Sequence, residues 1–219
     1  MHYSKFKKLL DTLLAFLGLI VLSPLFFILI IAIKVDSRGP IFFKQKRIGL
    51  NKEYFYILKF RTMRIDTPKD VPTHLLKNPE QYITKVGRIL RKTSLDELPQ
   101  IINILKGEMA IVGPRPALWN QYDLIAERDK YGVNNIRPGL TGWAQVNGRD
   151  TIEIVDKARF DGDYTERMSF AFDIKCIFRT IIVVLKRRDV VEGGTGIISN
   201  KAEKDGILEE NENYKVKKA

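Results

Sequence analysis

The chain has 219 residues, of which 45% are hydrophobic and 10% aromatic, and these values exclude a wholly disordered protein. That length allows one main domain with a substantial core. Lys and Arg number 37 against 26 Asp and Glu, so the net charge of +11 predicts an anionic partner: nucleic acid, an anionic membrane surface or a phosphorylated substrate. The single cysteine, Cys176, excludes an intramolecular disulfide and a cysteine-based zinc cluster.

An apolar run occupies residues 13–33, and Ser23 is its only polar side chain. As a helix rising about 1.5 Å per residue, this run would reach about 31 Å, which is one hydrocarbon thickness. A secretory signal peptide would have a shorter apolar region and a small-residue cleavage site. The run therefore predicts a retained membrane segment.

Ser23 and Pro24 interrupt the middle of this run. Pro24 has no N–H and its ring clashes with the carbonyl four residues back, so we expect a kink, with the Ser23 hydroxyl as a candidate donor to the freed carbonyl. Basic residues flank the run on both sides, so the positive-inside rule gives no orientation. Two interpretations stay open: a helix that bends here and returns to the same leaflet, or a spanning helix with a tolerated proline.

The remaining segments predict an α/β domain that is mostly helical and has a small β element. Residues 39–63 hold aromatic and β-branched clusters broken at Gly49-Leu50-Asn51, which predicts short strands joined by a turn. Apolar periodicity and composition predict helices over 82–91, 100–105, 118–131 and 172–188, a short apolar stretch at 109–112, and loops at 66–79 and 137–149. The last helix carries apolar residues at helical spacing beside basic ones, which predicts a core or an interfacial helix.

Asp96 and Glu97 are adjacent carboxylates that follow Arg91 and Lys92. Mg²⁺ is usually held by one or two carboxylates plus substrate phosphates, and an aspartate can attack phosphorus and form an acyl phosphate. The competing interpretation is structural, because Ser94-x-x-Glu97 matches a capping box and acids in a first turn complement the helix dipole. Taken alone, the segment favours the cap.

Three other segments could contact a substrate. Gly113-Pro114-Arg115-Pro116 fixes the backbone around one Arg, whose planar fork suits phosphate oxygens, although a rigid loop with a solvated Arg is the simpler interpretation. Strand alternation would place Lys59 and Arg61 on one face, as in an edge strand with a basic outer face. The loop at 137–149 could use Trp143, Gln145 and Asn147 on a base or sugar, or Trp143 could fill the core.

The two histidines, His2 and His74, lie at a terminus and in a Pro-rich loop, which makes a histidine-based triad or zinc site improbable. The chain also has no GxxxxGK[ST] motif, which argues against a Walker NTPase.

Taken together, these segments resemble the bacterial sugar transferase family, the monotopic phosphoglycosyl transferases. Each piece is weak alone, but the ordered set covers about residues 6–186 and is highly specific. The similar pieces are the apolar run with Ser23-Pro24, GPIFFKQKRIG, ILKFRTM, GRILRKTSLDELPQIINILKGEMAIVGPRP and RPGLTGWAQVNGR, followed by Asp161, Tyr164, Ser169 and Asp173. The chain is similar to the small form of the family that consists of the catalytic core.

The resemblance implies a re-entrant helix hairpin broken at Ser23-Pro24, followed by a membrane-associated catalytic domain on the cytoplasmic face of the bacterial inner membrane. It implies a ping-pong reaction: Asp96 attacks the phosphate next to the sugar of a UDP-sugar, UMP leaves, and polyprenyl (undecaprenyl) phosphate takes the phosphosugar. Glu97 and Mg²⁺ assist, with Asp96 and Glu97 as the expected metal ligands, and Glu97 is either a ligand or a proton carrier. The implied phosphate-binding residues are Arg91, Arg115, Lys59 and Arg61, and the implied substrate-binding residues are Arg137, Gly139, Gln145, Asn147, Arg149 and Asp161.

Three regions are expected: a re-entrant membrane helix over 1–38, the catalytic domain over 39–199 and a flexible charged tail over 200–219. The helices over 82–91 and 172–188 would then rest in the headgroup layer. An N-acetylated hexosamine is the expected sugar, with a plain hexose still open, for capsule, exopolysaccharide, O-antigen or glycoprotein glycan assembly. A nucleic-acid partner is not expected, and the oligomeric state stays open. The alternative is a membrane-anchored basic module that binds nucleic acid or anionic lipid without catalysis, with steep salt dependence and no need for Mg²⁺.

Overall fold

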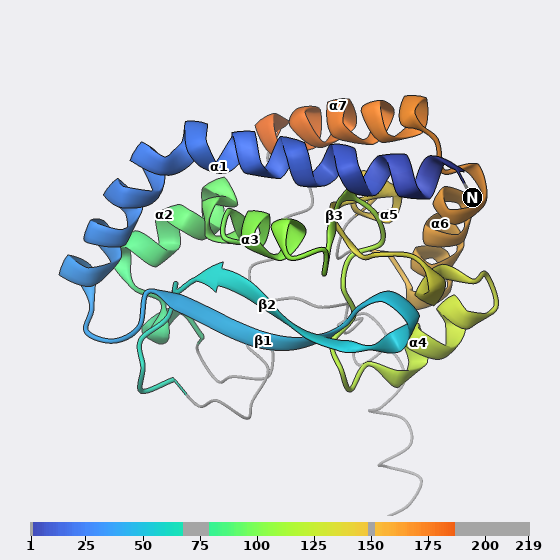
Figure 1. Cartoon of the computed structure of the whole chain (residues 1–219). Coiled ribbons are helices and arrows are strands. Elements are labelled where there is room, and N and C mark those ends of the chain that lie inside the picture. The colour runs from blue at the N-terminus through green and yellow to red at the C-terminus, as the bar shows by residue number, and fades with distance from the viewer. Residues whose placement is uncertain (1, 68–78, 149–151, 187–219) are drawn as a thin grey trace, which may run out of the picture.

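The computed structural model describes residues 2–67, 79–148 and 152–186. Its helices are α1 (His2–Asp36), α2 (Lys85–Thr93), α3 (Gln100–Leu105), α4 (Tyr122–Asp129), α5 (Trp143–Val146), α6 (Ile154–Arg167) and α7 (Phe170–Lys186). Its strands are β1 (Phe42–Ile48), β2 (Tyr54–Phe60), β3 (Ala110–Val112) and β4 (Gly139–Thr141). In Figure 1, α2 and α3 lie between α1 and the β1–β2 ribbon, and α4, α5 and α6 gather at the end near the N-terminus.

The predicted strands over 39–63 are confirmed as an antiparallel hairpin. Phe42 pairs with Phe60 at its open end and Ile48 with Tyr54 at its closed end. The connecting turn contains Asn51 in a left-handed conformation (φ 52°), which asparagine tolerates better than most residues because its short side chain bonds locally. The hairpin packs on α3, where Phe55 and Ile57 of β2 share a cluster with Ile101 and Ile104.

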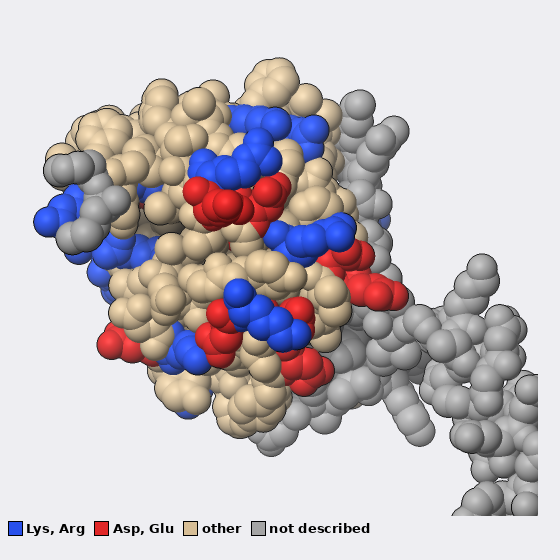
Figure 2. All heavy atoms as spheres, turned by 90° about the vertical axis from the view of Figure 1, so that its right-hand side faces the viewer, with Lys and Arg blue, Asp and Glu red and all other residues tan. Residues whose placement is uncertain are grey.

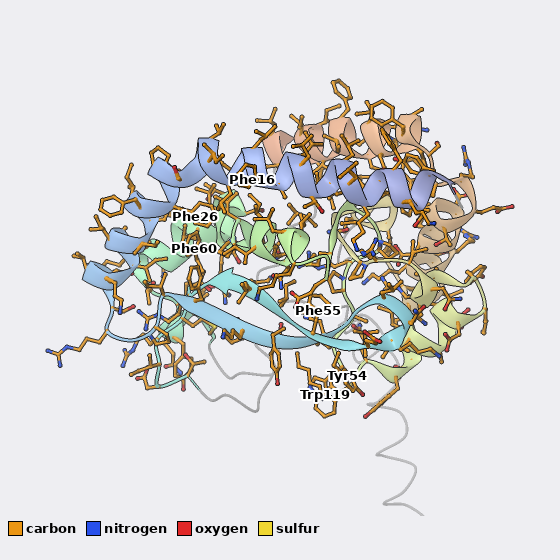
Figure 3. The ribbon with its side chains drawn as sticks, in the orientation of Figure 1. Phe16, Phe26, Tyr54, Phe55, Phe60 and Trp119 are labelled. Atoms are coloured by element: carbon orange, nitrogen blue, oxygen red, sulfur yellow. The ribbon has the colours of Figure 1, made fainter. Side chains whose placement is uncertain are left out.

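Helix α1 is one continuous helix through Pro24, and it bends as the sequence predicts. Its ribbon changes direction between the labelled residues Phe16 and Phe26 (Figure 3). The Ser23 hydroxyl donates to the Ile20 carbonyl at 2.7 Å, and this is the carbonyl four residues before Pro24 that the proline cannot serve. The sequence thus placed both the kink and its compensating bond correctly.

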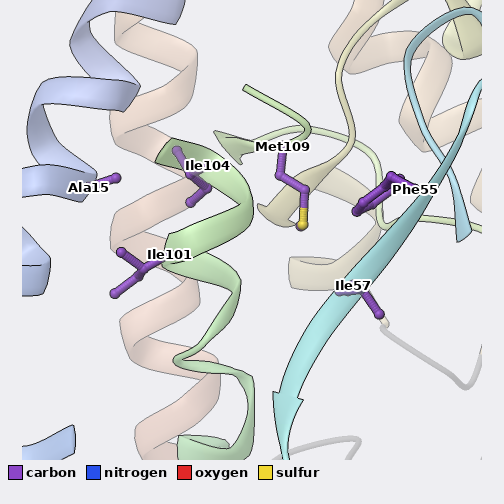
Figure 4. Packing of buried hydrophobic residues seen from close by; sticks show 6 residues of the cluster. All are labelled: Ala15, Phe55, Ile57, Ile101, Ile104 and Met109. Atoms are coloured by element: carbon purple, nitrogen blue, oxygen red, sulfur yellow. The ribbon is translucent and has the colours of Figure 1, made fainter. Parts of the chain in front are cut away.

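The core is shared between α1 and the rest of the chain. Ala15 of α1 packs against Ile101 and Ile104 of α3, whose other side meets Phe55 of β2 (Figure 4). A second cluster joins the distal half of α1 to β2 and α2 through Phe26, Leu29, Ile33, Phe60 and Leu90. Because α1 contributes to both clusters, it is docked on β2, α2 and α3 over most of its length.

The outer side of α1 is apolar and exposed. The large exposed side chains there are Phe6, Leu9, Leu13, Leu14, Phe16, Leu17, Ile20, Val21, Phe27, Ile28, Ile31 and Val35. By length and composition, α1 could cross a membrane. This surface is far larger than the scattered apolar residues that soluble proteins usually expose, so it marks an interaction with an apolar phase.

The region over 137–149 contains regular structure that the loop prediction missed. Strand β4 pairs in parallel with β3, and the one-turn helix α5 follows it. A Cβ on Gly139 would lie 2.1 Å from the Gly113 amide nitrogen, so only glycine fits where these two segments touch. Trp143 is 8% exposed and packs on Phe172 at 4.9 Å between ring centroids, which supports the interpretation of this tryptophan as a core residue.

Other helix boundaries differ from the predicted ones for local reasons. Helix α2 begins at Lys85 because the Thr84 hydroxyl caps it, accepting from the Gly87 amide at 2.9 Å. Helix α4 is shorter than predicted, and α6 occupies a segment to which no element was assigned. Helix α7 buries Phe172 and Cys176 and exposes its apolar stripe, whose members are Phe170, Ile174, Phe178, Ile181 and Leu185.

Candidate active site

The two adjacent carboxylates lie in a short 3₁₀ turn, η4 (Leu95–Glu97), between α2 and α3. Ser94 ends α2 in a left-handed conformation (φ 57°) and starts this turn, and its side chain makes no capping bond. The Glu97 carboxylate points to two cations instead. The capping box is therefore not formed, and the competing structural interpretation of Ser94-x-x-Glu97 does not hold. A non-glycine residue held at positive φ is also a feature that functional sites often contain.

Glu97 joins two cations that come from distant parts of the chain. Its Oε1 accepts from Lys59 Nζ at 2.8 Å and from Arg115 Nη2 at 3.0 Å. Lys59 stands near the end of β2, and Arg115 lies in the loop after β3. The side chains of Glu97 and Lys59 are 15% and 17% exposed, so water screens this ion pair only partly. The fold thus brings together three of the predicted site residues, with Lys59 and Arg115 bound to one oxygen of Glu97.

The environment separates the pKa values of the two carboxylates. Burial raises the pKa of Asp96 from its ordinary 3.8 to about 6, with Glu97 adding to the rise and Lys59, Arg91 and Arg115 opposing it. Burial also raises the pKa of Glu97, but Arg115 and Lys59 outweigh it and hold that pKa well below its usual range. Glu97 is therefore a fixed anion, and Asp96 is mainly ionised at pH 7 but close to its titration.

Arg91 is the third cation whose charge acts on Asp96. It lies in the last turn of α2, and its Nε donates to Thr62 Oγ1 at 2.9 Å. Thr62 follows β2 by two residues, so the same stretch of chain that presents Lys59 also orients Arg91. Lys59, Arg91 and Arg115 together form what we call the cation cluster, which surrounds Asp96 and Glu97.

Arg61 was predicted to bind phosphate, but the structure places it elsewhere. Its guanidinium donates to the carbonyls of Arg38 and Ser37, both at 2.6 Å, just beyond the end of α1. Strand β2 ends at Phe60, so the alternation that would have aligned Lys59 with Arg61 no longer applies. Asp36, at the end of α1, accepts from the Val86 amide in the first turn of α2. These contacts tie the end of α1 to the two elements that carry Lys59 and Arg91.

Asp161 was predicted to contact substrate, and it is instead buried. Its side chain is 1% exposed and forms an ion pair with Arg128 at 2.6 Å. Burial raises the pKa of Asp161, and the charge of Arg128 opposes that rise. Both side chains are closed off from solvent in this structure.

The remaining predicted substrate residues that the structure describes bond to backbone carbonyls or lie in β4. Arg137 Nε donates to the Gly107 carbonyl, Gln145 Nε2 to the Leu140 carbonyl, and Asn147 Nδ2 to the Trp143 carbonyl. Gly139 lies in β4, where its role is close packing. Arg149 lies outside the described residues. None of these three contacts, made by Arg137, Gln145 and Asn147, is to a residue of the cation cluster.

Two buried arginines that the sequence analysis did not single out support the site. Arg47 of β1 donates to the Pro116 carbonyl at 2.9 Å, and Arg128 of α4 donates to the Arg115 carbonyl at 3.0 Å. A signal for Arg128 was present, because it stands four residues after Leu124 and so shares the buried face of its helix. A charged residue at such a position usually has a specific partner.

Comparison with known proteins identifies the family to which the chain belongs. A family described as "Bacterial sugar transferase" matches residues 2–187. An exopolysaccharide production protein, ExoY, from Sinorhizobium fredii is 38% identical over 83% of this chain and 86% of its own length. The UDP-glucose:undecaprenyl-phosphate glucose-1-phosphate transferase of Escherichia coli is 42% identical over 80% of this chain, which spans 39% of that relative. The sugar transferase EpsL of Bacillus subtilis, described as uncharacterized, is 39% identical over 82% of this chain and 87% of its own length. The chain belongs to the bacterial sugar transferase family.

Proposed function

We propose that the protein transfers a sugar 1-phosphate from a UDP-sugar to polyprenyl phosphate, as the first membrane step of a bacterial surface polysaccharide or glycoprotein glycan. The observation that carries this proposal is the pairing of Asp96 with Glu97 inside the cation cluster. Relatives from E. coli, Xanthomonas campestris and Klebsiella pneumoniae are named as glucose-1-phosphate transferases that act from UDP-glucose on undecaprenyl phosphate. These names support the reaction class.

The reaction we infer has two phosphoryl transfers through Asp96. An Asp96 carboxylate oxygen attacks the phosphorus next to the sugar, the bond to the bridging oxygen breaks, and UMP leaves with that electron pair. A phosphate oxygen of the polyprenyl phosphate then attacks the same phosphorus and releases the Asp96 carboxylate, giving a polyprenyl diphosphate sugar. Splitting the transfer in this way is typical of carboxylate nucleophiles.

The cation cluster suits this chemistry. A phosphoryl transfer needs positioning and neutralisation of charge on the phosphate oxygens more than it needs covalent help. The cation cluster supplies that neutralisation through its positive charges, so no proton has to be transferred to the phosphate oxygens. The low pKa of Glu97, set by Arg115 and Lys59 against the opposing effect of burial, favours a permanently ionised carboxylate over a proton carrier. Glu97 then fixes two of the cations and keeps the pKa of Asp96 raised.

Mg²⁺ is part of this proposal, and Asp96 and Glu97 are the residues that would hold it. Both residues offer carboxylate oxygens, and Oε1 of Glu97 also accepts from Lys59 and Arg115. In the part of the chain that the structure describes, no cluster of three or more His, Cys, Asp or Glu side chains could hold a metal. The fit is therefore to an ion that takes its other ligands from the diphosphate, as Mg²⁺ commonly does, and that would neutralise charge on it.

The membrane arrangement that we propose is a re-entrant α1 on the cytoplasmic face of the inner membrane. Two observations support it: the bend stabilised by Ser23, and the exposed apolar surfaces of α1 and α7. Tyr3 and Lys7 near the start of α1 both bind Asp173 of α7, at 2.7 and 2.6 Å, so these surfaces belong to one rigid body. A protein anchored in this way meets a soluble nucleotide sugar and a lipid phosphate at the same interface.

On one face of the molecule, the charge distribution argues against a basic module without catalysis. Figure 2 shows basic side chains next to acidic ones on the face toward the N-terminal end of α1. Surface ion pairs of α4 and α6, which lie on this side in Figure 1, are of this kind: Lys130–Glu127, Arg159–Asp156 and Arg167–Asp163. A polyanion-binding surface would instead gather one sign of charge.

The test is the fate of Asp96. With a UDP-sugar and no acceptor, the wild-type protein should release one UMP and gain the mass of a sugar phosphate, and Asp96→Asn should do neither. Asp156→Asn, an exposed aspartate on α6, is the matched control and should behave as wild type. UMP release by Asp96→Asn at the wild-type rate would overturn the nucleophile. A panel with UDP-glucose and UDP-N-acetylhexosamines, read by the same release, decides the sugar, for which we keep an N-acetylated hexosamine as the proposal.

A further inference from the structure

The loop that carries Arg115 is held by its carbonyl groups. Residues 113–116 read Gly-Pro-Arg-Pro, and the two prolines cannot donate backbone hydrogen bonds. Four successive carbonyls, those of residues 114–117, each accept from a different donor: the Gly139 amide at 2.8 Å, Arg128 Nη1 at 3.0 Å, Arg47 Nη1 at 2.9 Å and the Ile48 amide at 3.0 Å. The loop is thus fixed from outside, residue by residue.

Arg128 makes the contact at Arg115 itself. Its Nη1 donates to the Arg115 carbonyl, while its Nε and Nη2 both donate to Asp161 Oδ2, at 3.0 and 2.6 Å. The side chains of Arg128 and Asp161 are 4% and 1% exposed. Asp161 therefore fixes the guanidinium plane, and that plane fixes the carbonyl of the residue whose side chain binds Glu97.

Stability alone is a weak reason for this arrangement. A buried ion pair gains little net stability over apolar side chains of the same volume, because desolvating two charges is expensive. Here the pair is not even fully satisfied, since Asp161 Oδ1 is buried without a hydrogen-bond partner among the described residues. What the pair does provide is an N–H directed at the Arg115 carbonyl. Arg115 lies outside the strands, so a β-sheet hydrogen bond does not fix this carbonyl.

We propose that Arg128, oriented by Asp161, is a positioning residue for the reaction, because it sets the Arg115 guanidinium against Glu97 and the diphosphate. This inference rests on the proposed function. Arg128 touches no substrate and acts through Arg115. A displacement of about 1 Å in a positioned catalytic group can lower a rate by about 100-fold, so a loosened loop should affect turnover well before it affects folding.

The experiment is a double-mutant cycle between Arg128 and Arg115. Arg128→Lys keeps the charge but loses the planar fork that reaches the Asp161 carboxylate and the Arg115 carbonyl together. We expect it to lower kcat for UMP release by about 10- to 100-fold, and to add less than about twofold in an Arg115→Gln background, since the group it positions is gone. Equal losses in both backgrounds would overturn the positioning role.

The coupling to Arg115 separates positioning from a merely structural effect, because a general loosening of the fold would lower the rate by the same factor in both backgrounds. Asp129→Asn, at the next residue of α4 and in an exposed pair with Lys52, is the matched control and should leave the rate unchanged. If Arg128→Lys folds poorly, the neutral pair Arg128→Met with Asp161→Leu avoids an unpaired buried charge and should show the same coupling.

Inorganic pyrophosphate is a probe that does not depend on turnover. Its binding should weaken in Arg128→Lys and in Arg115→Gln, and the two losses should again not add. An active wild type with additive losses would sink this inference and leave the proposed function standing. An inactive wild type with coupled pyrophosphate affinities would overturn the proposed function and support the coupling between Arg128 and Arg115.

Discussion

Asp96→Asn should make the protein more stable while it abolishes the proposed chemistry. Burial, aided by Glu97 and opposed by the cation cluster, raises the pKa of Asp96 from 3.8 to about 6. At about 1.36 kcal/mol per pKa unit, ionising this side chain in the folded protein costs about 3 kcal/mol. An amide of the same shape carries no charge and avoids this cost. For a chain of this size, about 3 kcal/mol corresponds to a rise in Tm of about 6–12 °C.

The sign of the pH dependence follows from the raised pKa. The folded state favours the protonated Asp96, so the wild-type protein loses stability as pH rises from about 4 to about 6, and the loss is constant above that. Asp96→Asn has no carboxyl group at this position and therefore lacks this loss of stability. Thermal unfolding in detergent micelles between pH 4 and pH 8 should therefore show equal stabilities near pH 4 and the full difference at pH 7. A variant that is less stable than wild type at pH 7, or a difference that is the same at both pH values, would refute the reasoning.

Glu97→Gln is the matched comparison, because the neighbouring carboxylate should respond with the opposite sign. Arg115 and Lys59 outweigh burial and hold the pKa of Glu97 below its usual range. Its ionised form therefore contributes stability that is present at pH 7 and is lost as pH falls through the folded pKa. Neutralising Glu97 should lower the Tm at pH 7 and leave the partly exposed Lys59 and Arg115 without their shared anion.

Three further predictions concern the rate, the core and the membrane helix. Below pH 6, UMP release should fall about tenfold per pH unit as Asp96 becomes protonated, and a rate that stays flat to pH 5 would exclude this titration. Asn103→Leu should lower the free energy of unfolding by about 2–6 kcal/mol in denaturant titrations, because it strips the buried Leu58 amide and Tyr56 carbonyl of their partners at about 1–3 kcal/mol each. Pro24→Ala should straighten α1, so that cysteines introduced at 5–8 and at 38–47 label from one side of the membrane in the parent and from opposite sides in the variant. Opposite-side labelling in the parent would replace the re-entrant helix with a spanning one.

The sequence was most informative where local chemistry decides the structure. The kink at Pro24 and the bond from Ser23 follow from a missing N–H and a hydroxyl one residue away. Helix α3 was predicted with its observed bounds, since its apolar residues stand between a proline and a glycine-containing turn. The strands over 39–63 follow from β-branched and aromatic clusters on either side of a turn. In each case the determining groups lie within a few residues of one another.

Where buried positions hold polar or small residues, apolar periodicity did not predict the element. The buried residues of α6 include Ala158, Asp161, Gly162 and Tyr164, so its inner face carries no apolar stripe for a periodicity argument to find. The role of Asp161 depends on Arg128, 33 residues earlier, and no spacing rule connects them. Arg61 shows the same limit, because its partners are carbonyls at the end of a helix that precedes it by more than 20 residues.

The Asp96-Glu97 pair shows why the opposite pKa shifts of the two carboxylates could not be predicted from the sequence. Two adjacent carboxylates have nearly the same intrinsic acidity and the same neighbours along the chain. They differ because a 3₁₀ turn aims the Glu97 side chain at Lys59 and Arg115, which both donate hydrogen bonds to it. Asp96, which is half-buried, feels these cations through their charge, and the effect of burial on its pKa outweighs them. Since each carboxylate feels the charge of the other, pinning Glu97 in its ionised form is itself one reason that Asp96 titrates near pH 6. An ionised carboxylate that is only weakly stabilised as an anion suits the nucleophile that we propose, and the contacts of Glu97 with Lys59 and Arg115 help to create that state.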